Sequence, residues 1–198
     1  TVALIRTPLE VVMRRTNINS HNLYAEALLK RVGQKVTGQP GSWENGAAVI
    51  RMAALKRLGP ERASKVVIAD GSGMTRDNLV TAEGLARWLV SFHHDQRVGE
   101  QFIESLPVAR EDGSMKARFA GRDLQAEIRA KTGYLRQVSS LSGYVTDSAS
   151  GRRLVFSVIV NDFSAKTPLK TVKDFQEAVA LLAHDTLMKR SGRPNLGG

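Results

Sequence analysis

Two short clusters in this sequence carry side chains that could do chemistry. They are residues 20–22 (Ser-His-Asn) and residues 131–133 (Lys-Thr-Gly). A serine hydroxyl is a weak nucleophile until a neighbouring group removes its proton, so its chemistry depends on what lies beside it. Each cluster is a weak signal alone, because Ser20 and Asn22 are also typical helix caps and Lys131 is typical of a solvated strand end. The order of the two clusters along the chain and the elements predicted around them make each cluster a stronger signal than it is alone.

The first cluster lies between two predicted helices. Residues 7–10 (Thr-Pro-Leu-Glu) combine an N-cap, a proline at the first helical position and a glutamate at N3, and this helix should end in the polar residues 16–19. From Ser20 onward, apolar residues recur at helical spacing as far as Gly33, where we expect the helix to stop. The cluster is therefore predicted to lie in the loop that enters the second helix.

The second cluster ends the clearest strand signal. Residues 124–131 alternate strictly between apolar and polar side chains, which predicts one face packed on a core and a polar face ending at Lys131. Residues 138–146 and 153–160 follow as two more strands at hairpin distances, with turn residues at 147–151.

The other elements complete the predicted fold. We expect a short strand over residues 65–69, a polar connection over 110–123, and helices over the ranges 42–58, from Thr81, about 96–106 and about 168–189. The last helix should pack on the sheet through Val172, Phe175, Val179, Leu182 and Leu187. Helices followed by an antiparallel meander and a closing helix indicate an α+β layer architecture. Residues 1–190 are expected to form one domain, and 191–198 a flexible Gly-rich tail.

Composition excludes several classes of site. The absence of cysteine excludes disulfides, thiolate zinc sites and a cysteine nucleophile. No run approaches the roughly 20 apolar residues of a membrane helix, so we expect no membrane span. His93 and His94 are adjacent on a helix and point in different directions, and we expect neither metal nor cofactor. The net charge of +10 would suit nucleic acid, but the basic residues are scattered as pairs, which favours a solvated surface without a nucleic-acid partner.

The flanks of the two clusters carry a family resemblance. They read NSHNLYAEALL around Ser20, DGSGMTR from Asp70, KTGYL from Lys131 and LSGY from Leu141. In this order they resemble the D-alanyl-D-alanine carboxypeptidase/endopeptidase family of low-molecular-mass penicillin-binding proteins, which are serine DD-peptidases related to β-lactamases. The resemblance runs from about Thr7 to about Asn161. It implies the β-lactamase/DD-peptidase-like transpeptidase fold, of which this chain would be a C-terminal part.

The resemblance also implies catalytic roles. Ser20 would bridge Lys131 and the lysine of the S-x-x-K motif, and so relay a proton to the leaving D-alanine. Asn22 would donate a hydrogen bond to an amide carbonyl of the substrate. Lys131 would attract the carboxylate of a D-Ala-D-Ala stem peptide or of a β-lactam.

Substrate-binding roles would fall to the residues after Lys131. Gly133 would let the substrate backbone lie against the strand, the amide of Tyr134 would form half of the oxyanion hole, and Thr132 would orient the strand. The family usually has Thr or Ser where this chain has Tyr134, and Asp is commoner than His21. Residues 70–73 are expected to form a turn that shapes the floor of the cleft.

The S-x-x-K motif that carries the family's nucleophile is absent from this sequence. No serine is followed by lysine three residues later, and Ser114-Met115-Lys116 is one residue short. We therefore expect the nucleophile and its base on a missing N-terminal segment of the same protein, and expect this chain to be inactive alone. The intact protein would be a penicillin-binding serine-type carboxypeptidase of peptidoglycan, periplasmic or otherwise extracytoplasmic. The alternatives are a non-catalytic peptidoglycan-binding module and a basic nucleic-acid-binding domain.

Overall fold

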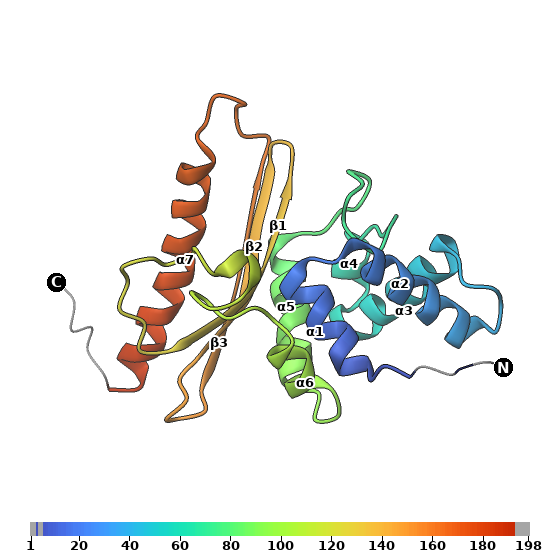
Figure 1. Ribbon diagram of the computed structural model, residues 1–198, viewed down its shortest axis with the longest axis horizontal. Helices are drawn as coiled ribbons and strands as arrows, with labels where there is room; N and C mark the ends of the chain where they lie inside the picture. Colours follow the sequence, from blue (N-terminus) through green and yellow to red (C-terminus); the bar gives the residue numbers. More distant parts are fainter. Residues whose placement is uncertain (1–2, 4–5, 193–198) are drawn as a thin grey trace.

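Helices and a three-stranded sheet make up the structure, which is a computed structural model that describes residue 3 and residues 6–192. Figure 1 shows helices α1–α6 gathered on one side and the sheet with α7 on the other. The helices are α1 (Leu9–Asn19), α2 (Asn22–Thr37), α3 (Trp43–Leu58), α4 (Pro60–Ala63), α5 (Ala82–His93), α6 (Gly99–Glu104) and α7 (Leu169–Arg190), with a 3-10 turn η1 (Gly113–Met115). The strands are β1 (Glu127–Leu135), β2 (Val138–Thr146) and β3 (Arg153–Asn161). The predicted α+β class is confirmed.

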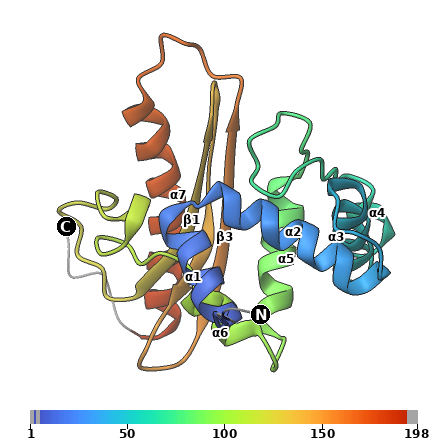
Figure 2. The same cartoon turned by 45° about the vertical axis from the view of Figure 1, so that its right-hand side comes forward.

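The sheet is antiparallel with the order β1-β2-β3, so β1 and β3 are its edge strands. Its register pairs Lys131 with Ser142 and Gly133 with Ser140. Helix α7 covers one face and α5 lies on the other, as Figures 1 and 2 show. The sheet is therefore the middle layer of the molecule, and β1 presents one edge beside the helical part.

Two apolar clusters hold these layers together. The larger lies between the sheet and α7, and buries Met115, Phe119, Ile128, Leu141, Val145 and Leu187 among others. The smaller lies between the sheet and helices α5 and α6, and contains Leu89, Ile103, Leu106 and Tyr144. The Tyr144 hydroxyl donates a 2.7 Å hydrogen bond to the Leu89 carbonyl, and burial raises the pKa of this phenol.

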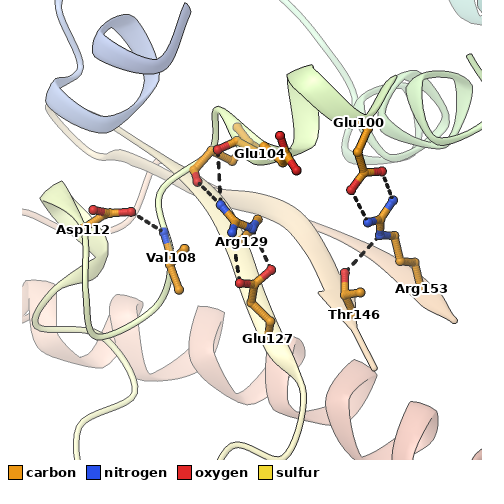
Figure 3. Close-up of polar contacts among 9 residues, drawn as sticks. Glu100, Glu104, Val108, Asp112, Glu127, Arg129, Thr146 and Arg153 are labelled. Atoms are coloured by element: carbon orange, nitrogen blue, oxygen red, sulfur yellow. Dashed lines mark hydrogen bonds and ion pairs between the residues drawn. The ribbon is translucent and has the colours of Figure 1, made fainter. Parts of the chain in front are cut away.

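Charged pairs also join the sheet to the helical part (Figure 3). The Nη1 and Nη2 nitrogens of Arg153 on β3 donate hydrogen bonds to the two carboxylate oxygens of Glu100 on α6, at 2.8 and 2.7 Å. Arg129 on β1 donates to Glu127 and also to the backbone carbonyl of Glu104. The hydrogen bonds from Arg153 lower the pKa of Glu100. These contacts fix the helical part against the sheet face that carries Arg129.

Local capping signals placed several helices correctly. Ser42 and Asn45 form the reciprocal capping box that starts α3, and the Thr81 hydroxyl accepts from the Gly84 amide to start α5. Gly33, however, does not end α2. A Cβ at Gly33 would lie 2.2 Å from Asn45 Oδ1, so this glycine allows α2 and α3 to pack closely. Helix α2 ends at Thr37 and is capped by Gly38, which has φ 71°.

Two further predictions need correction. Residues 65–69 form no strand, and Val67 makes only an isolated bridge with Leu79. Strand β1 starts at Glu127 and continues to Leu135, so Lys131 lies in its middle rather than at its end. Pairing with β2 extends the strand beyond the stretch of alternating residues.

The inward face of α7 also differs from the prediction. Val172 and Leu187 are buried, but the side chains of Phe175 and Leu182 are 57% and 68% exposed. The buried stripe instead includes two polar residues, Gln176 and His184. Ser139 Oγ on β2 accepts from Gln176 Nε2, and the backbone amides of residues 125 and 126 donate to His184 Nε2, so both polar groups are satisfied inside.

The prediction for the tail after Gly192 lies outside the described residues. Among the described residues, no helix is both long enough and apolar enough to cross a membrane.

Candidate functional site

Ser20 ends helix α1 in a left-handed backbone conformation, with φ 50° and ψ 50°. This conformation is uncommon for residues other than glycine. The amides of Ser20 and His21 both donate to the Thr16 carbonyl, and the chain then turns directly into α2, whose first residue is Asn22. The first cluster is thus a tight link between two helices, shorter than the predicted loop.

The structure brings Lys131 to Ser20. The Lys131 ammonium donates to Ser20 Oγ at 2.5 Å and to the backbone carbonyl of Thr132 at 2.9 Å. Burial lowers the pKa of Lys131. Among the described residues, no carboxylate forms an ion pair with this ammonium. A half-buried, unpaired amine next to a hydroxyl can exchange a proton with it and can attract an anion.

The outer edge of β1 is covered along only part of its length. Ala109 donates to the Ile128 carbonyl at 2.9 Å, and Ala130 donates to the Pro107 carbonyl at 3.0 Å. Because hydrogen-bonding directions alternate along a strand, the amides of Thr132 and Tyr134 point to this same edge. No backbone of the described residues pairs with the edge beyond Ala130. The strand therefore offers free amides beside Lys131.

Gly133 sits opposite Ser140 in the β1–β2 pair. A Cβ at Gly133 would lie 2.4 Å from Ser140 Oγ, closer than real Cβ contacts come. The glycine therefore leaves room for the Ser140 hydroxyl in its present orientation, which is a reason that sequence reasoning did not anticipate.

The remaining predicted site residues are exposed. The Asn22 side chain makes no hydrogen bond to any described residue and is free to meet a ligand. The His21 ring stacks on Tyr24, with ring centroids 4.0 Å apart, and so stays with α2. The Tyr134 side chain is 61% exposed.

A carboxylate that sequence reasoning missed holds the turn at residues 70–73. Glu26 on α2 accepts from the amides of Gly71 and Ser72, at 3.1 and 3.0 Å, and from Trp43 Nε1 at 2.8 Å. Burial alone would raise the pKa of Glu26, but these hydrogen bonds outweigh it and the pKa lies below its ordinary value. The turn is thereby fixed to the helix that begins at Asn22.

The segment after this turn reaches the sheet. Asp70 accepts from the Asn78 side chain, which closes the loop, and Arg76 donates to the carbonyl of Arg136 at the β1–β2 turn. A charged residue followed by Gly-Ser-Gly signals a turn in the sequence, but nothing local indicates which strand the loop will meet.

Ser114 is a second residue that sequence reasoning did not assign to the site. Its Oγ lies 2.6 Å from Thr132 Oγ1. The Asp-Gly pair before it marks a turn, yet the approach of that turn to β1 depends on the tertiary fold alone.

An apolar cavity of about 770 Å³ lies in the helical part. Its lining includes Met13, Leu28, Ile50, Leu85 and Trp88, and it extends to Thr16, one turn before Ser20, and to Gly71. Within the described part of the chain, no three His, Asp or Glu side chains gather closely enough to hold a metal ion. The site offers the hydroxyls of Ser20 and Thr132, the Lys131 amine, the Asn22 carboxamide and free backbone amides of β1.

Comparison with known sequences points to one family. The family model described as D-Ala-D-Ala carboxypeptidase 3 (S13) matches residues 3–184. The chain is 35% identical over 167 residues to a D-alanyl-D-alanine carboxypeptidase of Actinomadura sp. (strain R39), which covers 82% of this chain and 29% of that protein. It is 32% identical to carboxypeptidase DacB of Mycolicibacterium smegmatis, over 82% of this chain and 36% of that protein. The chain thus spans about a third of the length of these curated relatives.

Solved structures share the fold. Penicillin binding protein 4 (dacB) of Haemophilus influenzae, in complex with a β-lactam, superposes with a TM-score of 0.70 at 23% identity, over 89% of this chain and 42% of that chain. A β-lactamase of Streptosporangium roseum gives a TM-score of 0.63 at 18% identity, over 89% and 65%. The expected β-lactamase/DD-peptidase-like fold is confirmed, with this chain as part of it.

Proposed function

The chain belongs to the D-Ala-D-Ala carboxypeptidase 3 (S13) family, and on that premise we propose that it forms part of a serine-type D-Ala-D-Ala carboxypeptidase/endopeptidase. The enzyme would cleave peptidoglycan stem peptides through an acyl-enzyme and would be acylated by penicillins. The observation that carries the proposal is the hydrogen bond between Lys131 and Ser20, made from residues 111 positions apart.

Ser20 and Lys131 would move the proton of the reaction. As the amide bond breaks, the leaving amine of the terminal D-alanine must gain a proton. Ser20 Oγ can deliver its own proton and recover one from a neighbouring amine. Burial lowers the pKa of Lys131, so its ammonium gives up a proton more readily than an exposed lysine would.

The substrate peptide would lie along the free edge of β1. Its backbone can pair there as an added strand, with the Tyr134 amide aimed at the scissile carbonyl oxygen. The exposed side chain of Asn22, at the start of α2, would hold an amide carbonyl of the same peptide.

The nucleophile would come from a segment outside this sequence, since no serine here has lysine three residues later. Two observations support this. The matched part of this chain covers only 29% and 36% of the length of the two relatives. An apolar cavity of about 770 Å³ lies beside Thr16 and Gly71, and a large apolar cavity is unfavourable when left to water. We propose that the helix carrying S-x-x-K occupies it.

The proposed substrate also indicates where the enzyme works. Peptidoglycan stem peptides lie outside the cytoplasm, so the protein would act in the periplasm or another extracytoplasmic space. No cofactor is required by this chemistry.

A fluorescent penicillin tests the proposal. The complete protein should be labelled at a serine outside this sequence, and residues 1–198 expressed alone should not be labelled. Mass spectrometry of the digested adduct identifies the serine. Labelling of a serine within residues 1–198 would contradict the assignment. Absence of labelling in the complete protein, with retained binding of a D-Ala-D-Ala peptide, would instead favour the non-catalytic peptidoglycan-binding module.

A further inference from the structure

Three buried polar side chains form a continuous line between α7 and the sheet. They are Arg118, in the connection before β1, Gln176 on α7 and Ser139 on β2. Arg118 Nη2 donates to Gln176 Oε1 at 3.1 Å, and Gln176 Nε2 donates to Ser139 Oγ at 3.0 Å. Burying such groups is costly unless each of them finds a hydrogen-bond partner, and here they find one another.

The arginine fixes the direction of every hydrogen bond in this line. A guanidinium can only donate, so Gln176 must turn its oxygen toward Arg118 and its amide nitrogen toward Ser139. Ser139 Oγ must therefore accept, which leaves its single proton for another acceptor. That acceptor is the backbone carbonyl of Gly133 on β1, 3.5 Å away. Among the described residues, Ser139 Oγ has no other hydrogen-bond partner.

The line ends on a peptide group that the proposed function already uses. The Gly133 carbonyl and the Tyr134 amide belong to the same peptide bond, and in a trans peptide these two groups point in opposite directions. With the carbonyl turned toward Ser139 on β2, the Tyr134 amide points to the free outer edge of β1. A hydrogen bond to the carbonyl polarises the whole peptide group and makes its N–H a stronger donor.

Glu177 anchors the cationic end of the line. Its carboxylate accepts from Arg118 Nε at 2.6 Å and from the Phe119 amide at 3.1 Å, and Arg118 also donates to the Lys173 carbonyl. In each of the three links toward β1, the donor lies on the side of Arg118 and the acceptor on the side of the strand. The three hydrogen bonds are therefore aligned, and aligned hydrogen bonds strengthen one another.

We propose that Gln176 and Ser139 are positioning residues of the oxyanion hole. They connect the charge of Arg118 to the Gly133–Tyr134 peptide and so strengthen the Tyr134 amide as a donor to the reacting carbonyl oxygen. This inference rests on the proposed function. Because negative charge develops on that oxygen only as the tetrahedral intermediate forms, a stronger donor accelerates acylation more than it tightens the initial binding.

Benzylpenicillin reports the strength of this amide in two ways. For the complete protein, stopped flow gives the limiting rate of acylation and the dissociation constant of the complex that precedes it, and infrared difference spectroscopy gives the stretching frequency of the acyl-enzyme carbonyl. Ser139→Ala should lower the limiting rate about two- to tenfold, the range for one neutral hydrogen bond, and change the dissociation constant less than about twofold. The carbonyl frequency should rise, because a weaker hydrogen bond polarises the ester carbonyl less.

Further variants separate this role from a structural one. Gln176→Leu removes the link before Ser139 and should shift the rate and the frequency in the same directions. Ser139→Thr keeps the hydroxyl and should retain both values. As a matched control, Ser157→Ala removes a hydroxyl of β3 that is bonded to Ser142 Oγ, on a strand that does not pair with β1, and should change neither. Ser139→Cys, a weaker donor of nearly the same size, gives the same test should Ser139→Ala not fold.

The outcomes distinguish this inference from the proposed function. Unchanged rate and frequency in the folded variants at Ser139 and Gln176 overturn the inference. A joint loss of rate and binding without a shift in frequency also overturns it, because that result indicates a purely structural role. Both results leave the proposed function intact. If the unmodified protein is not acylated at all, the proposed function fails and the inference fails with it.

Discussion

The ammonium of Lys131, in the middle of strand β1, donates a hydrogen bond to Ser20 Oγ at the end of helix α1. This contact crosses the junction between the helical part and the sheet. It joins the first and second clusters into one site whose other side is the free edge of β1. The predictions that follow test this junction and the packing that supports it.

Removal of either member of the pair should impair acylation. In the complete protein, Ser20→Ala and Lys131→Met should each lower the rate of labelling by a fluorescent penicillin about 100-fold or more, the range for a positioned proton-transfer group. Lys131→Arg separates charge from proton transfer, because arginine stays protonated. The Lys131→Arg protein should be labelled slowly, although its arginine still binds the carboxylate of the penicillin. Labelling of Ser20→Ala at the original rate would remove the proposed relay.

Lys131 should also give the stability a defined dependence on pH. Its folded pKa lies below the ordinary 10.5, so the unfolded chain binds more protons in the window between these values. Stability therefore rises with pH through that window. We expect the free energy of unfolding, relative to Lys131→Met, to increase as the pH approaches 10.5. Urea denaturation of both proteins at several pH values measures it, and a difference that falls with pH would refute the burial of this ammonium.

Glu26 should also make stability rise with pH, but in the acidic range and because its charged form is the one that the fold stabilises. Its folded pKa is depressed, so the stability that it contributes is present above the ordinary 4.5 and is lost as the pH falls through the folded value. Glu26→Gln should lower the thermal midpoint at neutral pH and should equal the unmodified protein in acid. The same variant should increase proteolysis at residues 70–79, because the turn loses its anionic acceptor. An unchanged cleavage pattern would show that Glu26 does not hold the turn.

Gly133 should tolerate a larger residue only if Ser140 is replaced by a smaller one. Gly133→Ala places a Cβ 2.4 Å from Ser140 Oγ and should destabilise the protein by about 1–3 kcal/mol. Addition of Ser140→Ala removes the colliding oxygen and should recover much of that loss. Chemical denaturation of the two single variants and the double variant forms a complete cycle. Additive effects would mean that the two residues do not meet.

Loss of the buried ion pair between Arg118 and Glu177 should lower the free energy of unfolding far more than loss of an exposed ion pair on α7, the helix that carries Glu177. The Arg118 side chain is 6% exposed and bonds to Glu177 at 2.6 Å. Glu177→Gln leaves this guanidinium without its counter-charge and should cost about 3–5 kcal/mol. Asp174→Asn breaks the exposed pair with Lys170 and should cost less than about 1 kcal/mol. Equal losses in urea denaturation would contradict the difference in burial.

Much of the fold was predictable because its signals are local. The Ser42 and Thr81 caps start helices through hydrogen bonds within one turn. The alternation before Lys131 predicts a strand because neighbouring side chains point to opposite faces. The β2 strand lies at its predicted bounds. The family resemblance then depended on four stretches of residues in a fixed order, and the sequence contains these four stretches although it lacks S-x-x-K.

The predictions that proved wrong concern residues at contacts between two elements. Gly33 was read as a helix end, but it serves the contact between α2 and α3. Phe175 was assigned to the core by helical spacing, yet α7 turns the polar Gln176 and His184 inward because β2 and the two residues just before β1 satisfy their hydrogen bonds. Periodicity describes which residues share a face, and only the partner element determines which face is buried.

The sequence by itself determined the residue types of the site, the α+β class and the family. The tertiary structure alone decided that Lys131 reaches Ser20, that Glu26 holds the turn after Asp70, and that Ser114 meets Thr132. These contacts join residues far apart in the chain. They depend on how the strands pair and how α1 and η1 pack against β1, and no local pattern of residues specifies those distances.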